Sequence, residues 1–122
     1  KRIDIHWINL GEIKNWGRPK TYQYRKRFMD YISNVWSFNL KADVILIDGR
    51  FRVASFLFSL INAKENSVIF FDDYINRPQY HVVEEILKYD EKCGRQAVFR
   101  VPKIYDKSLA QKLLNHFIYV FD

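Results

Sequence analysis

The sequence has a single cysteine and no long apolar run. Because Cys93 is alone among 122 residues, neither an internal disulfide nor a cysteine-based zinc site can form. We therefore expect a reducing compartment, the cytoplasm. No apolar stretch approaches the ~20 residues that a membrane-spanning helix needs, and the opening KRIDIHWINLG lacks the apolar core of a signal peptide. The sequence therefore predicts no membrane segment.

The charge is unbalanced towards the basic side. The 20 Lys and Arg exceed the 14 Asp and Glu and give a net charge of +6, which favours an anionic ligand, a nucleic acid or an acidic partner. The densest basic cluster, residues 25–27, lies on an amphipathic segment and fits a solvated helix face better than a binding site. No nucleic-acid-binding module is recognisable, so charge alone supports nucleic-acid binding, and we rank it last.

The composition suits a folded domain. Hydrophobic residues make up 48% of the chain and aromatic residues 17%, which is enough for one core over residues 1–122. We find no repeat, no low-complexity tract and no second domain. The chain begins with Lys1 rather than Met, so the hypothesis that it is a fragment of a larger domain stays open.

Two apolar runs, each ending in acid, flank a helical segment in the middle of the chain. The runs ADVILIDGR and SVIFFDDY are apolar on consecutive residues, which is typical of strands in a parallel sheet, and FRVASFLFSLINAK between them predicts a helix. The three form a β-α-β crossover. Because such crossovers are right-handed, both strands end at one sheet edge, where we expect Asp48, Asp72 and Asp73 to lie near one another. Open α/β folds bind ligands at that edge.

Further elements extend this alternation on both sides. We predict strands over residues 3–9, 97–101 and 118–121, and helices over residues 21–36, 78–93 and about 107–114. Pro78 suits the start of the second of these helices and Gly94 its end, and Asp106 or Ser108 can cap the third. Strands that alternate with helices predict an α/β fold, a three-layer sandwich around a mainly parallel sheet.

The three acids are candidate metal ligands. Hard cations such as Mg²⁺ and Ca²⁺ prefer several oxygen ligands, and Asp48, Asp72 and Asp73 can supply them from two neighbouring strand ends. Alternatively, these acids end strands and cap the helices that follow. The adjacent pair favours function, because neighbouring carboxylates repel each other and a cap needs only one. Both interpretations stay open.

Basic and aromatic residues follow each acidic strand end. Gly49 allows a sharp turn and a close approach to a ligand. Arg50 and Arg52 can hold a carboxylate or phosphate of a substrate, or they can pair with the acids beside them. Tyr74 and Arg77 are the corresponding substrate-binding candidates after the second strand.

Two other side chains are candidates for chemistry or binding. His81 lies one turn into a predicted helix and can act as a general base, although a lone histidine is more often structural. Trp16 lies between Gly11 and Gly17 in the loop over residues 11–20, where it can stack on a ring of a ligand. The sequence shows no Ser-His-Asp order, no phosphate-cradling glycine loop and no HExxH pattern.

The run DVILIDGRFRVASFLFSLINAKENSVIFFDDY resembles the second half of class I S-adenosylmethionine-dependent methyltransferases. In that family a strand ending in IDG or IDA is followed by a helix and a strand ending in DD or DN, and the resemblance covers residues 43–92. It implies a Rossmann-like sheet and transfer of a methyl group to an oxygen or nitrogen of a small-molecule acceptor.

The resemblance also implies roles for individual residues. In the metal-dependent O-methyltransferase branch the matching acids bind the cation that orients the acceptor, which implies a site for Mg²⁺ at Asp48, Asp72 and Asp73. If the domain is active, Asp48 and Asp73 position the acceptor, and His81 is the candidate base. Our candidate contacts of the cofactor, S-adenosylmethionine, are Gly11, Trp16, Asp48 and Gly49.

The first part of the family pattern is missing. The family holds its cofactor with a glycine-rich turn after the first strand and an acid ending the second, and this chain shows neither. INLGEIKNWGRP resembles the segment after the third strand, which implies a fold truncated at its N-terminal side. One hypothesis is therefore a methyltransferase-like domain that needs the missing half for cofactor binding. The other is a non-catalytic, degenerate Rossmann-like domain whose incomplete sheet edge binds a second copy or another partner.

Overall fold

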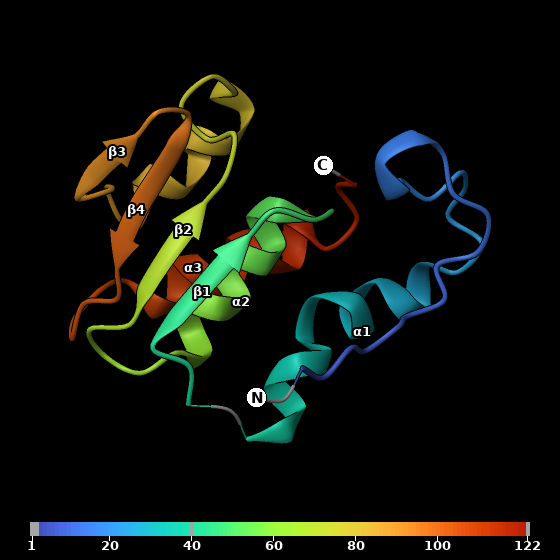
Figure 1. The fold of residues 1–122 in the computed structure, drawn as a ribbon, viewed down its shortest axis with the longest axis horizontal. Helices are drawn as coiled ribbons and strands as arrows, with labels where there is room; N and C mark the ends of the chain where they lie inside the picture. Colours follow the sequence, from blue (N-terminus) through green and yellow to red (C-terminus); the bar gives the residue numbers. More distant parts are fainter. Residues whose placement is uncertain (1–2, 40, 122) are drawn as a thin grey trace.

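The computed structural model describes residues 3–39 and 41–121 (Figure 1). Its four strands are β1 (Val44–Ile47), β2 (Val68–Phe71), β3 (Glu91–Cys93) and β4 (Gln96–Arg100). Its α-helices are α1 (Phe28–Ser33), α2 (Arg52–Asn62) and α3 (Lys107–Phe117). Short 3₁₀ helices are η1 (Asn15–Gly17), η2 (Arg25–Arg27), η3 (Asn34–Phe38) and η4 (Pro78–Glu85). Across the described ranges, no helix has the length and apolarity needed to cross a bilayer.

The strands form one sheet in the order β1-β2-β4-β3. β1 and β2 are parallel, with Val44 opposite Val68, and α2 connects them, which confirms the predicted crossover. The prediction of a mainly parallel sheet is wrong, because β4 runs antiparallel to both β2 and β3. Gly94 has a φ of 61° in the tight turn between β3 and β4, so it forms a hairpin instead of ending a helix.

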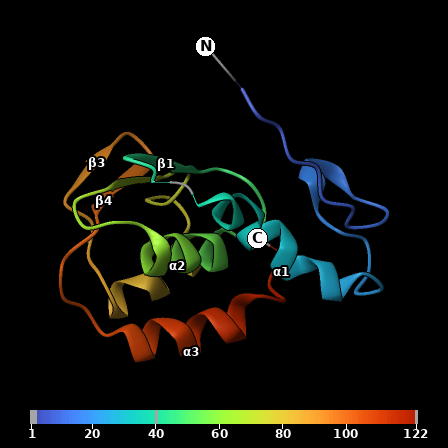
Figure 2. The same ribbon diagram turned by 90° about the horizontal axis from the view of Figure 1, so that it is seen from below.

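The helices lie on one face of the sheet, so the predicted three-layer sandwich is not what the described residues form. Figure 2 shows α2 directly against the sheet and α3 beyond α2. On the opposite face, Val44 is 63% exposed and Leu46 is 60% exposed. A third layer would have buried these two side chains.

Aromatic side chains fill the space between the sheet and the helices. Phe56 of α2 packs on Phe99 and Phe71, with ring centroids 4.6 and 5.6 Å apart, and Phe71 packs on Tyr80 of η4 at 5.2 Å. All four side chains are fully buried. This packing fixes the start of α2 and the end of β2, which are the two elements that carry the acids.

The segment predicted as one helix over residues 21–36 is divided into η2, α1 and η3. Short polar side chains in it bind the backbone: the Ser33 hydroxyl donates to the Met29 carbonyl at 2.7 Å, and the Ser37 hydroxyl donates to the Asn34 carbonyl at 2.6 Å. Such bonds compete with the regular helical ladder and favour its interruption. η4 likewise has 3₁₀ geometry where a longer helix was expected, although Pro78 does stand at its start.

Two predicted strands do not form. Residues 3–9 are extended but pair with no strand among the described residues, and Ile3, Ile5 and Trp7 are 80–88% exposed. Residues 118–121 contain a turn instead of a strand, and the Phe121 ring packs on Phe28 at 5.4 Å. Both segments have strand-like composition, but neither belongs to the sheet formed by the described residues.

Candidate functional site

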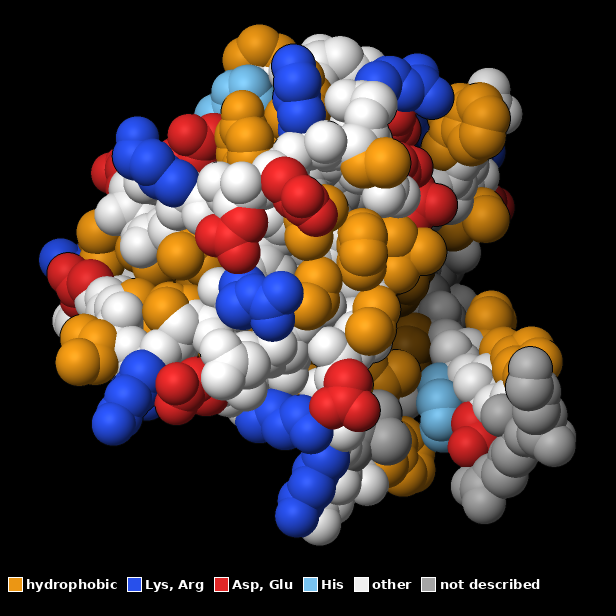
Figure 3. Space-filling view, turned by 60° about the vertical axis from the view of Figure 1, so that its left-hand side comes forward, with side chains coloured by type: hydrophobic (Ala, Val, Ile, Leu, Met, Phe, Trp, Pro, Cys, Tyr) orange, Lys and Arg blue, Asp and Glu red, His pale blue; other side chains and the backbone are white. Residues whose placement is uncertain are grey.

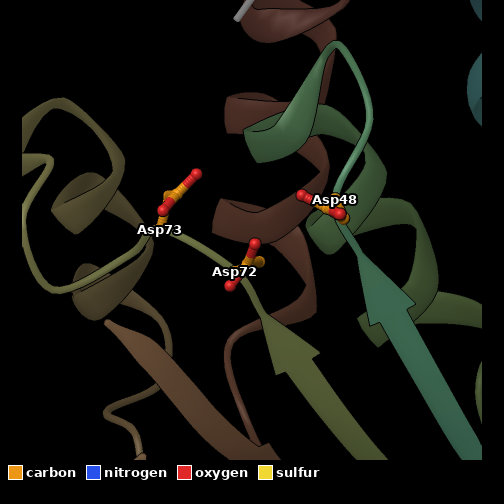
Figure 4. Close-up of side chains that lie close together, drawn as sticks. All are labelled: Asp48, Asp72 and Asp73. Carbon is orange, nitrogen blue, oxygen red and sulfur yellow. The ribbon is translucent and has the colours of Figure 1, made fainter. Parts of the chain in front are cut away.

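The carboxyl ends of β1 and β2 bring the three acids together, as expected (Figure 4). Asp48 directly follows β1, and Asp72 and Asp73 directly follow β2. One carboxylate oxygen from each lies within 4.8 Å of the others. Asp73 has a φ of 53°, a left-handed conformation that Asp tolerates better than most residues. This conformation turns the chain directly after the strand.

The guanidinium of Arg52 lies among these acids. Its side chain is only 4% exposed, and its nitrogens lie 3.4 Å from Asp48 Oδ1 and 3.6 Å from Asp73 Oδ2. Nη1 donates to the Asp72 carbonyl at 2.8 Å and Nε donates to the Gly49 carbonyl at 2.9 Å. Arg52 therefore joins the ends of β1 and β2 and supplies positive charge to the acid cluster. Of the two roles that the sequence left open for Arg52, substrate binding and pairing with the neighbouring acids, the structure shows the pairing.

Asp73 faces two more arginines besides Arg52. Its carboxylate oxygens lie 3.5 Å from Nη2 of Arg77 and 3.5 Å from Nε of Arg95, and its side chain is 15% exposed. A divalent cation at Asp73 would have to compete with three guanidinium groups. The donor set of the cluster suits Mg²⁺, but its present partners already provide the compensating charge.

Asp48 differs from Asp73 in its surroundings. Burial, its hydrogen bond to the Asp72 carboxyl and the negative charges of Asp72 and Asp73 raise the pKa of Asp48 above its ordinary value of 3.8, and the charge of Arg52 opposes this rise. Asp48 therefore holds a proton to a higher pH than a free aspartate does, so it is a stronger base once ionised.

This raised pKa predicts a pH dependence of stability. The folded chain binds the Asp48 proton more tightly than the unfolded chain, so the free energy of unfolding falls as the pH rises from 3.8 through the raised pKa. The variant Asp48→Asn has no carboxyl group at this position, so its free energy of unfolding does not fall for this reason. Between pH 3.8 and the raised pKa of Asp48, the variant therefore gains stability relative to the wild type. Urea unfolding at a series of pH values measures the difference. Asp43→Asn, at an exposed acid that is paired with Lys64 outside the cluster, is the matched control.

A cavity of about 890 Å³ opens beside the acid cluster. Three segments form its walls: the loop over residues 7–18, the segment after β1 and the segment after β2. The predicted site residues that line it are Gly11, Trp16, Asp48, Gly49, Arg50, Arg52, Asp73 and Arg77. The N-terminal loop, which is far from the acids in sequence, thus forms a common site with them.

Tyr74 and His81 do not line this cavity, and both side chains contact other parts of the chain. Tyr74 is fully buried, and its hydroxyl donates to Glu84 Oε2 at 2.7 Å. Burial and this hydrogen bond raise the pKa of Tyr74 well above its ordinary value. His81 Nε2 lies 2.9 Å from the Tyr74 carbonyl, which can only accept, so this nitrogen carries a proton. Both side chains stabilise the chain after β2.

Packing inside the protein explains why positions 11 and 49 are occupied by glycine. Gly11 has a φ of 84°, and a Cβ there would collide with the ring of Tyr24. A Cβ on Gly49 would collide with the hydroxyl of Tyr31, which accepts a hydrogen bond from the Arg50 backbone N–H at 3.1 Å. Both glycines line the cavity, but their lack of a side chain makes room for tyrosines and does not by itself indicate a ligand.

Some cavity residues were not predicted. Arg18, Tyr31, Asn76 and Gln79 also line the cavity, and Arg95 reaches Asp73 from the β3-β4 hairpin. Arg18 belongs to the same loop as Trp16, and this shared loop is the sequence feature from which Arg18 could have been predicted as a cavity residue. No sequence feature placed Arg95 near Asp73, because this contact depends on a hairpin that the sequence pattern did not indicate.

Comparison with known proteins bears on the fold. No protein-family model matches the chain, and no curated protein matches it. The structure is similar to the crystal structure of a methyltransferase-like protein from Silicibacter pomeroyi, with a TM-score of 0.80 and 34% sequence identity. The match covers 96% of this chain and 61% of the other, so this chain spans about three-fifths of the length of that protein. The chain therefore has an α/β, methyltransferase-like fold.

Proposed function

We propose that the cavity beside the acid cluster serves methyl transfer from S-adenosylmethionine to an oxygen or nitrogen of a small-molecule acceptor. The observation that carries the proposal is the position of Asp48 and Asp73 at the ends of two parallel strands, on the wall of a cavity, in a methyltransferase-like fold. The ends of parallel strands are where open α/β sheets bind their ligands.

The residues of the cavity fit the cofactor chemically. The volume of about 890 Å³ lies within the ~300–1,000 Å³ usual for small-molecule sites. S-adenosylmethionine carries positive charge at its sulfonium and amino groups, for which the Asp48 carboxylate is complementary. Its adenine is a flat ring, and the Trp16 side chain, 85% exposed at the cavity wall, offers a face for stacking. When bound, the cofactor would supply the reactive methyl group.

In this proposal the chain's own residues position the acceptor and take its proton. Asp48 acts as the base, because its carboxyl lies at the cavity with a raised pKa. Arg52 holds Asp48 and Asp73 in place through its contacts with both. Arg50 and Arg77 line the same cavity and orient an anionic group of the acceptor through forked hydrogen bonds.

We propose that this arrangement works without a divalent cation. Arg52 already supplies positive charge between Asp48 and Asp73, and Mg²⁺ would have to displace it. The metal-assisted alternative, with Asp48, Asp72 and Asp73 as ligands, predicts instead that Mg²⁺ strengthens cofactor binding.

Calorimetric titration of the chain with S-adenosylmethionine, with and without Mg²⁺, tests both forms of the proposal. We expect heat of binding without Mg²⁺ and the same affinity with it. Heat that requires Mg²⁺ would support the metal-assisted alternative. No heat under either condition would contradict cofactor binding by these residues.

A further inference from the structure

The turn between β1 and α2 contains a residue in a strained backbone conformation. Phe51 has a φ of 55° and a ψ of 47°, in the left-handed region, where the Cβ of a bulky residue crowds the backbone. Phe51 is the N-cap of α2, and Figure 4 shows how the chain passes from Asp48 through this turn into the helix. A glycine would adopt the same conformation without steric strain. The contacts of the phenylalanine must therefore offset the strain of its backbone.

The ring of Phe51 is held between aromatic side chains from two other parts of the chain. It is fully buried, and its centroid lies 4.9 Å from that of Phe28, 5.6 Å from that of Tyr31 and 5.9 Å from that of Phe121. Phe28 and Tyr31 belong to α1, and Phe121 belongs to the C-terminal segment. Burial of the ring stabilises the strained backbone, and a glycine would provide no such anchor.

The backbone of this turn is tied to the same two parts of the chain. The Arg50 N–H donates to the hydroxyl of Tyr31 at 3.1 Å. The Phe51 N–H donates to the carbonyl of Phe121 at 3.1 Å. α1 and the C-terminal segment therefore hold both the ring and the backbone, which leaves the turn little freedom to move.

The two arginines on either side of Phe51 are buried. Figure 3 shows charged side chains projecting from the surface on the side of the molecule that it views, whereas Arg50 is 8% exposed and Arg52 is 4% exposed. Arg52 Nε donates back across the turn to the Gly49 carbonyl at 2.9 Å, and Nη2 lies 3.4 Å from Asp48 Oδ1. Because Phe51 lies between Gly49 and Arg52, its backbone conformation determines whether this contact can form.

We propose that Phe51 is a positioning residue for the reaction: its left-handed backbone and buried ring hold Arg52, and through Arg52 the Asp48 carboxylate, in place. Strained conformations persist only where the surrounding structure fixes them, and they gather at functional sites. Reacting groups need such rigid support, because a small displacement lowers the rate of a reaction strongly. The inference rests on the proposed function for the role of Asp48, whereas the anchoring of Arg52 can be tested without a cofactor.

Solvent exchange of the Arg52 Nε–H, followed by ¹H–¹⁵N NMR without any ligand, tests the anchoring. Phe51→Gly relieves the strain but removes the ring, so we expect the Nε–H to exchange at least ~10-fold faster than in the wild type. The amides of Ile69 and Phe99, which are fully buried opposite each other in the sheet, stay protected and separate local loosening from global unfolding. Phe51→Leu is a second variant in case Phe51→Gly fails to fold by circular dichroism, with an expected increase of at least ~3-fold.

Leu60→Ala is the matched control. Leu60 is fully buried at the other end of α2, so its truncation destabilises the core without touching the turn. We expect the Arg52 Nε–H to stay as protected as in the wild type. Protection of the Nε–H in both Phe51 variants, or its equal release in Leu60→Ala, would overturn the proposal.

Calorimetric titration with S-adenosylmethionine tests the link between Phe51 and the reaction. After correction for the folded fraction, we expect Phe51→Gly to bind the cofactor at least ~5-fold more weakly than the wild type, and Leu60→Ala to bind it equally. Equal affinities of Phe51→Gly and the wild type would overturn this link. If the wild type itself binds no cofactor, the proposed function fails, and exchange of the Arg52 Nε–H still decides whether Phe51 anchors Arg52.

Discussion

Replacing Arg52 with methionine is expected to lower the free energy of unfolding by about 3–5 kcal/mol, the range for removing one partner of a buried ion pair. The guanidinium is 4% exposed and contacts Asp48, Asp73 and the backbone carbonyls of Gly49 and Asp72. Without it, acids within 4.8 Å of one another lose their central positive charge. Urea unfolding of the wild type and the variant measures the difference.

Arg95→Met is the matched control for this prediction. Arg95 also lies 3.5 Å from Asp73, but its side chain is 72% exposed, so we expect a loss of at most about 1 kcal/mol. Equal losses in the two variants would contradict the structural role of Arg52.

The same variant tests whether Arg52 takes the place of a metal ion. Removal of the guanidinium leaves the carboxylates of Asp48, Asp72 and Asp73 close together, with oxygen donors of the kind that Mg²⁺ prefers. We therefore expect millimolar Mg²⁺ to stabilise Arg52→Met and to leave the wild type unchanged. Stabilisation of the wild type by Mg²⁺ would show that the acids bind the ion with Arg52 in place.

The second large effect is expected in the core beneath the site. Phe71→Ala should lower the free energy of unfolding by about 3–5 kcal/mol, because truncation of a fully buried aromatic side chain leaves a cavity. Its ring packs on Phe56, Tyr74 and Tyr80, with centroids 5.0–5.6 Å apart. Since Phe71 directly precedes Asp72, its loss should also loosen the acid cluster.

Phe70→Ala provides the control in the same strand. Phe70 points to the opposite, partly exposed face, so its truncation removes less buried contact and should cost clearly less. Urea unfolding of the two variants compares the losses. Similar losses in both variants would contradict the finding that the core lies on one side of the sheet.

The centre of the fold could be predicted because its signals are local. In β1 and β2 the apolar residues are consecutive, the helix between them has a regular apolar stripe, and right-handed crossover then fixes where Asp48 and Asp72 lie. The proximity of the acids followed from these rules. The pairing of Arg52 with the acids was one of two alternatives, and only the structure decided between them.

The remaining elements depend on partners that a sequence pattern does not show. Residues 91–93 are all exposed and mostly polar, so no periodicity marked β3, and Gly94 suits either a helix end or a hairpin turn. Residues 3–9 have the composition of a strand, but a strand also requires a neighbouring edge. The direction of side chains after β2 depends on the left-handed backbone of Asp73, which the sequence did not indicate, so Tyr74 could not be placed in the core.

The central claim is that S-adenosylmethionine binds in the cavity between the N-terminal loop and the acid cluster. Two-dimensional ¹H–¹⁵N NMR during titration with the cofactor tests it residue by residue. The account predicts shifts at the Trp16 indole N–H and at the backbone amides of Gly11, Asp48 and Gly49, with no change at Ile104 on the far surface. Absence of shifts at these cavity residues, or shifts confined to other parts of the chain, would contradict it.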